Sequence, residues 1–175
     1  MAVAYNHEAE STEFHPRSEE ARHDFELTQP QSVDDLHLTR IENEQDIQAF
    51  LNQFGHTTEV GETEACFGAT CHGYLVAIGV LGPAAFLQHV TSSATTVTHL
   101  CGRPDTPHNT GAWLLGKIRR WAILEGYDSL YGLADKRGYA GTAYERAGFS
   151  RAHSMQAQSA LMMESIWKCD ITQFR

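Results

Sequence analysis

The stretch TTVTHLCGRPDTPHNTGAWLLGKIRRWAILEG, residues 95–126, has the clearest pattern in this sequence. It opens with β-branched side chains, which predict a strand over residues 95–101. A loop with two prolines follows, and apolar residues then recur at helical spacing from about Asn109 until Gly126 ends the helix. A strand, a loop and an amphipathic helix in this order predict one unit of a layered α/β protein. The apolar face of the helix consists of Leu114, Leu115, Ile118, Trp121 and Ala122.

The same alternation of strands and helices extends on both sides of this unit. Upstream, a strand is predicted over 35–41, a helix over 44–54 that Asn43 can cap, and a hairpin from strands 64–70 and 74–81. Downstream, strands are predicted over 129–134, 149–155 and 162–169, and a short helix over 141–146. We therefore predict an α/β fold with a mixed central sheet flanked by helices.

The start of the helix near residue 109 is a candidate anion site. The free N–H groups and the positive end of the dipole at a helix N-terminus attract negative charge. Asn109, Thr110 and Gly111 form the mouth of this site, and Gly111 allows a phosphate to approach the backbone closely. Arg103 can add charge-assisted hydrogen bonds. The alternative is that Asn109 or Thr110 only caps the helix and that Arg103 is a loop residue on the surface.

A second motif, GTAYERAGF, residues 141–149, follows the next strand and ends its short helix at Gly148. With both motifs in this order, the sequence resembles the GNAT acyltransferase superfamily over about residues 36–169, and in motif detail over 99–149. In that superfamily the helix after the fourth strand binds the pyrophosphate of coenzyme A, and a later Tyr-x-x-x-Gly-Phe segment packs beside the pantetheine and the thiol. The resemblance implies acetyl-CoA or another acyl-CoA as the cofactor and an amine as the acceptor.

The phosphate loop departs from the usual pattern of the superfamily, Arg/Gln-x-x-Gly-x-Gly/Ala. Here Arg103 is followed by a longer stretch that contains Pro104 and Pro107. Only Gly111 and Ala112 stand where the last two small residues of the pattern would. The resemblance therefore extends the candidate coenzyme A site to Ala112.

Within the superfamily, HLCGRPDTPHNTGAWLLGK together with GYAGTAYERAGF looks most like the phage Mom group. That resemblance implies modification of the exocyclic amine of adenine, so DNA is a candidate acceptor. The net charge of −9 opposes phosphate binding at low salt, although Lys117, Arg119 and Arg120 can form a local basic face. Charge neither supports nor excludes DNA as a substrate.

Three residues are candidates for proton transfer. The resemblance places Tyr144 where it can protonate a departing coenzyme A thiolate; the alternative is a core aromatic with its hydroxyl bonded to backbone. Asp135 ends a predicted strand, where α/β sheets place their ligands, and can accept a proton from the amine. His99 shares a strand face with Cys101 and is a second candidate base, or else a hydrogen-bonded core residue. His99, Cys101 and Asp135 mix ligand types that suit zinc or iron, but no recognised ligand spacing supports a metal site, so we predict none.

Composition bounds the class of protein. With 22 acidic and 13 basic side chains in 175 residues, the chain is typical of a salt-adapted protein or of an ordinary acidic one. Residues 1–33 lack periodic apolar positions and predict a disordered acidic tail, followed by one GNAT-like domain over 34–175. The sequence shows no secretory segment, no apolar run of ~20 residues and no CxxC pair among its four cysteines, so we expect reduced thiols, a cytoplasmic location and no membrane span.

The enzyme hypothesis has an alternative from another class. A non-catalytic module could keep the fold, and with it coenzyme A binding or an interaction surface, without any chemistry. The irregular phosphate loop favours that alternative, whereas Tyr144 and Asp135 favour the enzyme. The sequence leaves the oligomeric state open.

Overall fold

The structure is a computed structural model that describes residues 30–54, 60–84, 93–135, 139–152 and 163–172. The predicted tail lies almost wholly outside these ranges, and the described chain begins at Pro30. Ser32 caps a short 3-10 helix, η1 (Val33–Asp35), by accepting a hydrogen bond from the N–H of Asp34. None of the helices in the described part of the chain is long and apolar enough to cross a membrane.

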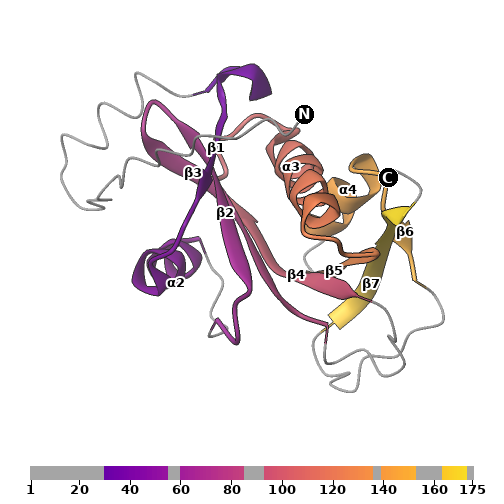
Figure 1. The fold of residues 1–175 in the computed structure, drawn as a ribbon. Coiled ribbons are helices and arrows are strands. Elements are labelled where there is room, and N and C mark those ends of the chain that lie inside the picture. The colour runs from indigo at the N-terminus through magenta and orange to yellow at the C-terminus, as the bar shows by residue number, and fades with distance from the viewer. Residues whose placement is uncertain (1–29, 55–59, 85–92, 136–138, 153–162, 173–175) are drawn as a thin grey trace, which may run out of the picture.

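One seven-stranded sheet forms the centre of the fold, in the order β1-β2-β3-β4-β5-β7-β6 (Figure 1). Only β4 and β5 run parallel, and the other neighbours pair antiparallel. The predicted α/β fold with a mixed sheet and flanking helices is therefore confirmed. The strands are β1 (His37–Arg40), β2 (Ala65–Cys71), β3 (Tyr74–Pro83), β4 (Ala94–Gly102), β5 (Ser129–Asp135), β6 (Ser150–Arg151) and β7 (Met163–Asp170). The longer helices are α2 (Glu44–Gln53), α3 (Thr110–Leu124) and α4 (Tyr139–Arg146).

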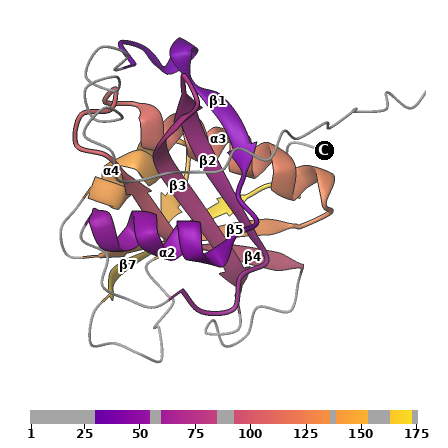
Figure 2. The ribbon, with the colours of Figure 1, turned by 90° about the vertical axis from the view of Figure 1, so that its left-hand side faces the viewer.

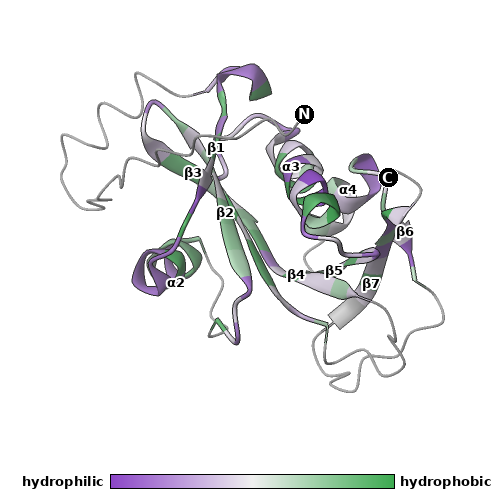
Figure 3. Ribbon diagram, in the orientation of Figure 1, coloured by the Kyte–Doolittle hydropathy of each residue, from purple (hydrophilic) through white to green (hydrophobic). Residues whose placement is uncertain are grey.

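Helices cover both faces of the sheet. α2 lies on one face and α3 on the other, as two perpendicular views show (Figures 1 and 2). β2 and β3 are largely hydrophobic because they are covered on both sides, whereas the outer side of α2 is hydrophilic (Figure 3). Under α2, Ile47, Phe50 and Leu51 pack against side chains of β2, β3 and β4 that include Cys66 and Cys101.

The predicted hairpin is confirmed, and its turn has a simple cause. Cys71 pairs with Tyr74, so the loop holds only two residues, His72 and Gly73. Their φ angles are 49° and 83°, and two positive φ values define the tight turn whose twist matches that of paired strands.

Two predicted boundaries shift at the second motif. α4 begins at Tyr139, two residues before the predicted start, and β6 holds only Ser150–Arg151 instead of beginning at Phe149. The N–H of Phe149 donates to the carbonyl of Tyr144 and that of Gly148 to Glu145, which is the hydrogen-bond pattern that closes a helix after a glycine. Phe149 therefore belongs to the end of α4, and the rest of the predicted strand, from residue 153, lies outside the described residues.

Candidate active site

The sheet opens between its two parallel strands. β4 and β5 pair over four positions, and the last pair is Val97 with Gly132. Beyond it β4 stays paired with β3 as far as Gly102, and β5 stays paired with β7 as far as Asp135. Among the described strands none pairs with these two segments on their facing sides. We call residues 98–102 and 133–135 the fork.

An extra residue marks the start of the fork on β4. Val80 of β3 pairs with His99 and the next residue, Leu81, pairs with Val97, so Thr98 has no partner in the register and forms a β-bulge. Along a strand, alternate N–H groups point to opposite neighbours. The β4 side of the fork therefore presents backbone donors that no strand of the described chain takes up.

The N-terminus of α3 has no side-chain cap from the residue that precedes it. Thr110 is buried, and both its N–H and its hydroxyl donate to the carbonyl of Pro107, at 2.9 and 2.7 Å. Asn109 precedes the helix, but its side chain makes no capping bond. Within the described residues, the N–H groups of Gly111 and Ala112 consequently have no acceptor, which leaves the positive end of the helix available to an anion.

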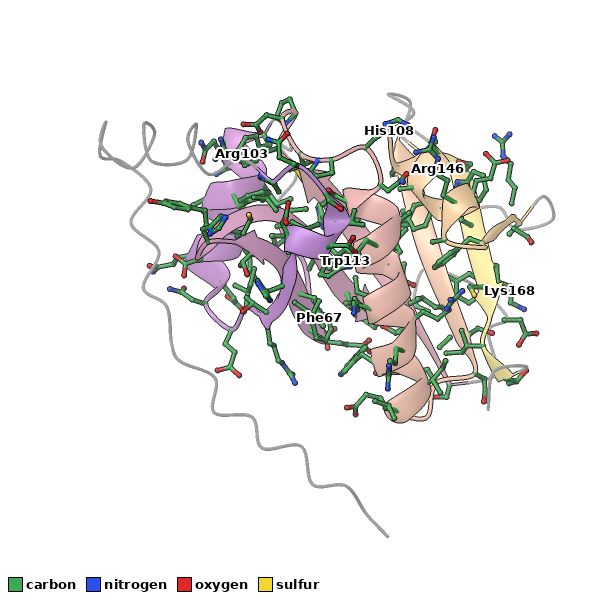
Figure 4. All side chains as sticks on the ribbon, turned by 90° about the horizontal axis from the view of Figure 1, so that it is seen from above. Phe67, Arg103, His108, Trp113, Arg146 and Lys168 are labelled. Carbon is green, nitrogen blue, oxygen red and sulfur yellow. The ribbon has the colours of Figure 1, made fainter. Side chains whose placement is uncertain are left out.

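An arginine that we did not assign from the sequence lies beside this helix start. Nη1 of Arg146, on α4, donates to Oδ1 of Asn109 at 2.8 Å. Arg146 is exposed, and it lies with His108 at the same end of α3 (Figure 4). Its place in GTAYERAGF was visible in the sequence, but its contact with residue 109 depends on how α3 and α4 pack.

Arg103 lies elsewhere. Its guanidinium pairs with both carboxylate oxygens of Asp105, at 3.2 Å each, and sits 5.8 Å from the ring centre of Phe54 at the end of α2. Figure 4 shows Arg103 well apart from His108 and Arg146. The structure thus brings Asn109, Gly111 and Ala112 together but not Arg103.

Gly111 has a packing reason to be glycine. A Cβ at this position would lie 3.1 Å from the Cβ of Ala143, on α4. The missing side chain therefore allows the first turn of α3 to touch α4 closely, in addition to the phosphate approach expected from the sequence. This contact also sets the distance between Arg146 and the start of α3.

Tyr144 lies at the base of the fork, on the α4 face of the sheet. Its side chain is fully buried, and its ring covers the backbone of Gly132, where a Cβ would collide with the ring atoms. Its hydroxyl donates to the carbonyl of Leu133, the first fork residue of β5, at 3.4 Å. Burial raises the pKa of the phenol well above its ordinary value, so the hydroxyl keeps its proton at neutral pH. The sequence indicated the residue but not its glycine partner.

The two candidate bases stand on different arms of the fork. His99 is half-buried on the β4 arm and shares the α2 face of the sheet with its partner Val80. Asp135 ends the β5 arm, where its backbone pairs with Met163; its side chain lies outside the described part of the structure. Cys101 shares the face of His99 but packs into the apolar cluster under α2, where burial raises its pKa to about 12. No group of three potential metal ligands occurs among the described residues.

Comparison with known proteins gives a likeness of structure only. No family model matches the sequence, and neither does any curated protein. A ribosomal-protein-S18-alanine N-acetyltransferase from Escherichia coli superposes with a TM-score of 0.57 at 18% identity, over 78% of this chain and 94% of that one. A spermidine N-acetyltransferase from Vibrio cholerae gives 0.58 at 10% identity, over 81% and 96%. A GNAT family acetyltransferase from Elizabethkingia anophelis, solved with acetyl-CoA bound, gives 0.52 at 11% identity, over 78% and 99%.

These likenesses define the class of the fold. This chain, with a mixed sheet flanked by helices on both faces, superposes on N-acetyltransferase structures over most of their length. The chain has the GNAT fold.

Proposed function

We propose that this protein transfers an acyl group from an acyl-CoA to an amine. The observation that carries the proposal is the position of the fork directly before an uncapped helix N-terminus: β4 leads through residues 103–109 into α3. The N–H groups of Gly111 and Ala112 and the guanidinium of Arg146 suit the pyrophosphate of coenzyme A, because phosphate binds at free helix starts and to arginine forks. Asn109 orients Arg146, and Arg103 has no part in the proposed site.

Within the fork, this chain supplies hydrogen bonds and proton acceptors. Bound acyl-CoA supplies an activated thioester. Backbone N–H groups on the β4 arm stabilise negative charge on the thioester oxygen. The single proton of the Tyr144 hydroxyl is donated to the carbonyl of Leu133 before the reaction. As negative charge develops on the sulfur, the hydroxyl turns from Leu133 and donates to the sulfur instead; because its raised pKa exceeds that of a thiol, about 8.5 for free cysteine, sharing the proton is favoured over full transfer. His99 or Asp135 accepts the proton that the amine loses.

The acceptor is proposed only as a class. The resemblance of the two motifs to the Mom group supports the adenine amino group of DNA as the first acceptor to try. Small polyamines and peptide N-termini are the next amines to test. A module that binds coenzyme A without chemistry is the competing function, and it predicts binding with no turnover for any acceptor.

Calorimetric titration with acetyl-CoA tests the proposed site directly. We expect saturable binding that weakens about 10-fold to 100-fold in Arg146→Met, because a hydrogen bond from a charged group contributes about 1.5 to 3 kcal/mol. Arg120→Met is the matched control, since Arg120 is an exposed arginine of α3 that lies about 15 Å along that helix from its N-terminus. Absence of binding to the wild-type protein, or equal weakening in both variants, would refute the proposed coenzyme A site.

A further inference from the structure

The bulge on β4 joins a hydroxyl to a candidate base. Thr98 Oγ1 lies 3.2 Å from the carbonyl oxygen of Val80 and 3.2 Å from Nδ1 of His99. In a regular strand, neighbouring side chains point to opposite faces of the sheet. The extra residue in the register breaks this alternation, so Thr98 can reach the ring of the residue that follows it.

These two contacts decide where the protons lie. A threonine hydroxyl has one proton to donate, and a carbonyl oxygen can only accept. If Thr98 donated to His99, its oxygen would face the carbonyl oxygen of Val80 at 3.2 Å with no proton between them. If Thr98 instead donates to Val80, its lone pair accepts a proton from Nδ1 of His99, and both contacts become hydrogen bonds.

We propose that Thr98 is a positioning residue that holds neutral His99 as the tautomer with its proton on Nδ1 and its lone pair on Nε2. A second proton then adds at Nε2 without any change in the hydrogen bonds of Nδ1, since both ring nitrogens of a histidinium are donors. The neutral imidazole thus has Nε2 as its one basic atom, and it keeps the same orientation after that atom takes up a proton.

The role of this tautomer in catalysis rests on the proposed acyl transfer. The acceptor amine loses one proton to Nε2 of His99, and its nitrogen lone pair forms the bond to the acyl carbon. The bond between that carbon and sulfur breaks, and its electron pair leaves on the sulfur, which accepts the hydrogen bond of Tyr144. Thr98 touches none of the reacting atoms and acts only through His99.

Long-range proton–nitrogen NMR of the ¹⁵N-labelled full chain tests the tautomer without any substrate. The ring signals of His99 are assigned among the ten histidines by their loss in His99→Gln. We expect neutral His99 to carry its proton on Nδ1 in the wild-type protein and in Thr98→Ser, which keeps the hydroxyl. In Thr98→Val the proton should redistribute toward Nε2. A wild-type proton on Nε2, or a Thr98→Val spectrum identical to that of the wild type, overturns the proposal.

Kinetics with acetyl-CoA and the best amine acceptor separates this inference from the proposed function. For Thr98→Val we expect kcat to fall at least 10-fold with an unchanged KM for acetyl-CoA, and Thr98→Ser should restore most of the loss. Equal kcat in Thr98→Val and the wild type removes Thr98 from the positioning role. If the wild-type protein shows no turnover but has the Nδ1 proton, the proposed function fails while the tautomer stands. If Thr98→Val does not fold, the wild-type and Thr98→Ser spectra still decide.

Discussion

Two helices of this protein begin after an asparagine, and the two asparagines do different things. Before α2, Asn43 accepts a hydrogen bond from the N–H of Gln45 at 2.9 Å, and Glu44 and Asp46 add negative charge to the first turn. Before α3, Asn109 makes no capping bond, the first turn contains no acidic residue, and the amide oxygen accepts from Arg146 instead. The start of α2 is thus capped by its own chain, whereas the start of α3 has no side-chain cap and lies beside the guanidinium of Arg146.

This difference separates a structural use of a helix start from a ligand-binding one. An N-cap that bonds its own helix contributes stability. A helix start that gives up this bond keeps its N–H groups for a partner, at some cost in stability. Removal of the asparagine before α2 should therefore lower the stability of the protein and leave ligand binding unchanged. Removal of the asparagine before α3 should weaken ligand binding with little loss of stability.

The largest expected effect comes from forcing α3 away from α4. In Gly111→Val the new Cβ would lie 3.1 Å from the Cβ of Ala143, and the two methyl groups of valine need further space. Overpacking of this kind costs about 1 to 3 kcal/mol of stability. Acetyl-CoA affinity should fall more than 10-fold, because Arg146 moves with α4. Urea unfolding and calorimetry give the two quantities.

Gly116→Val is the control for this change. It lies on the same helix, and a Cβ there would meet nothing within 4 Å. Valine is a better helix former than glycine, so the free energy of unfolding should stay the same or rise by up to about 0.5 kcal/mol. Equal destabilisation by both valines would show that the contact between the helices is not tight.

A smaller effect follows from removing each asparagine side chain. Asn43→Ala should lower the free energy of unfolding by about 1 kcal/mol, as loss of a bonded N-cap does, and leave acetyl-CoA affinity unchanged. Asn109→Ala should cost less than about 0.5 kcal/mol, since no capping bond is lost, but it should weaken acetyl-CoA binding by releasing Arg146. Chemical denaturation and calorimetry on both variants compare the two helix starts. The reverse ranking of stabilities would mean that Asn109 caps α3 in solution.

The smallest expected effect comes from placing a negative charge at position 109, which should change stability and acetyl-CoA affinity in opposite directions. Asn109→Asp puts a carboxylate at the positive end of α3 and beside Arg146, which should raise the free energy of unfolding by about 0.3 to 1 kcal/mol. The same charge repels phosphate, so acetyl-CoA affinity should fall, and the loss should shrink in molar salt. Stability and affinity that rise together would contradict an anion site at this helix start.

Local patterns in the sequence predicted most of the fold. The elements follow the expected order because periodicity and turn residues are local, and Asn43 caps α2 as expected. The fork could not be predicted, because it depends on where the pairing of β4 with β5 stops, at Val97 and Gly132. The bulge could not be predicted either, because it depends on a register in which Val80 pairs with His99 rather than Thr98. The pairing of Arg146 with Asn109 spans 37 positions of sequence and exists only because Gly111 admits α4.

Candidate roles were harder to predict than candidate positions. Tyr144 was expected from its motif, but its burial against Gly132 follows from the meeting of α4 with β5. Arg103 was expected at the phosphates, whereas Asp105, only two residues away, engages its guanidinium. Long charged side chains choose among several partners, and the choice is made by the tertiary structure.

The brief pairing of β4 with β5 has a consequence for how the molecule opens. α3 packs against β2, β3 and β4, whereas α4 packs against β5 and β7. In the described chain the sheet joins these two groups at the four paired positions that end at Val97 and Gly132, next to hydrogen bonds from the N–H groups of Asp128 and Ser129 to the carbonyl of Ser93. The contact of α3 with α4 reinforces this link. In native-state hydrogen exchange the groups should behave as two cooperative units that separate at this seam. A ligand held by both arms of the fork would join them into one unit and slow exchange in each.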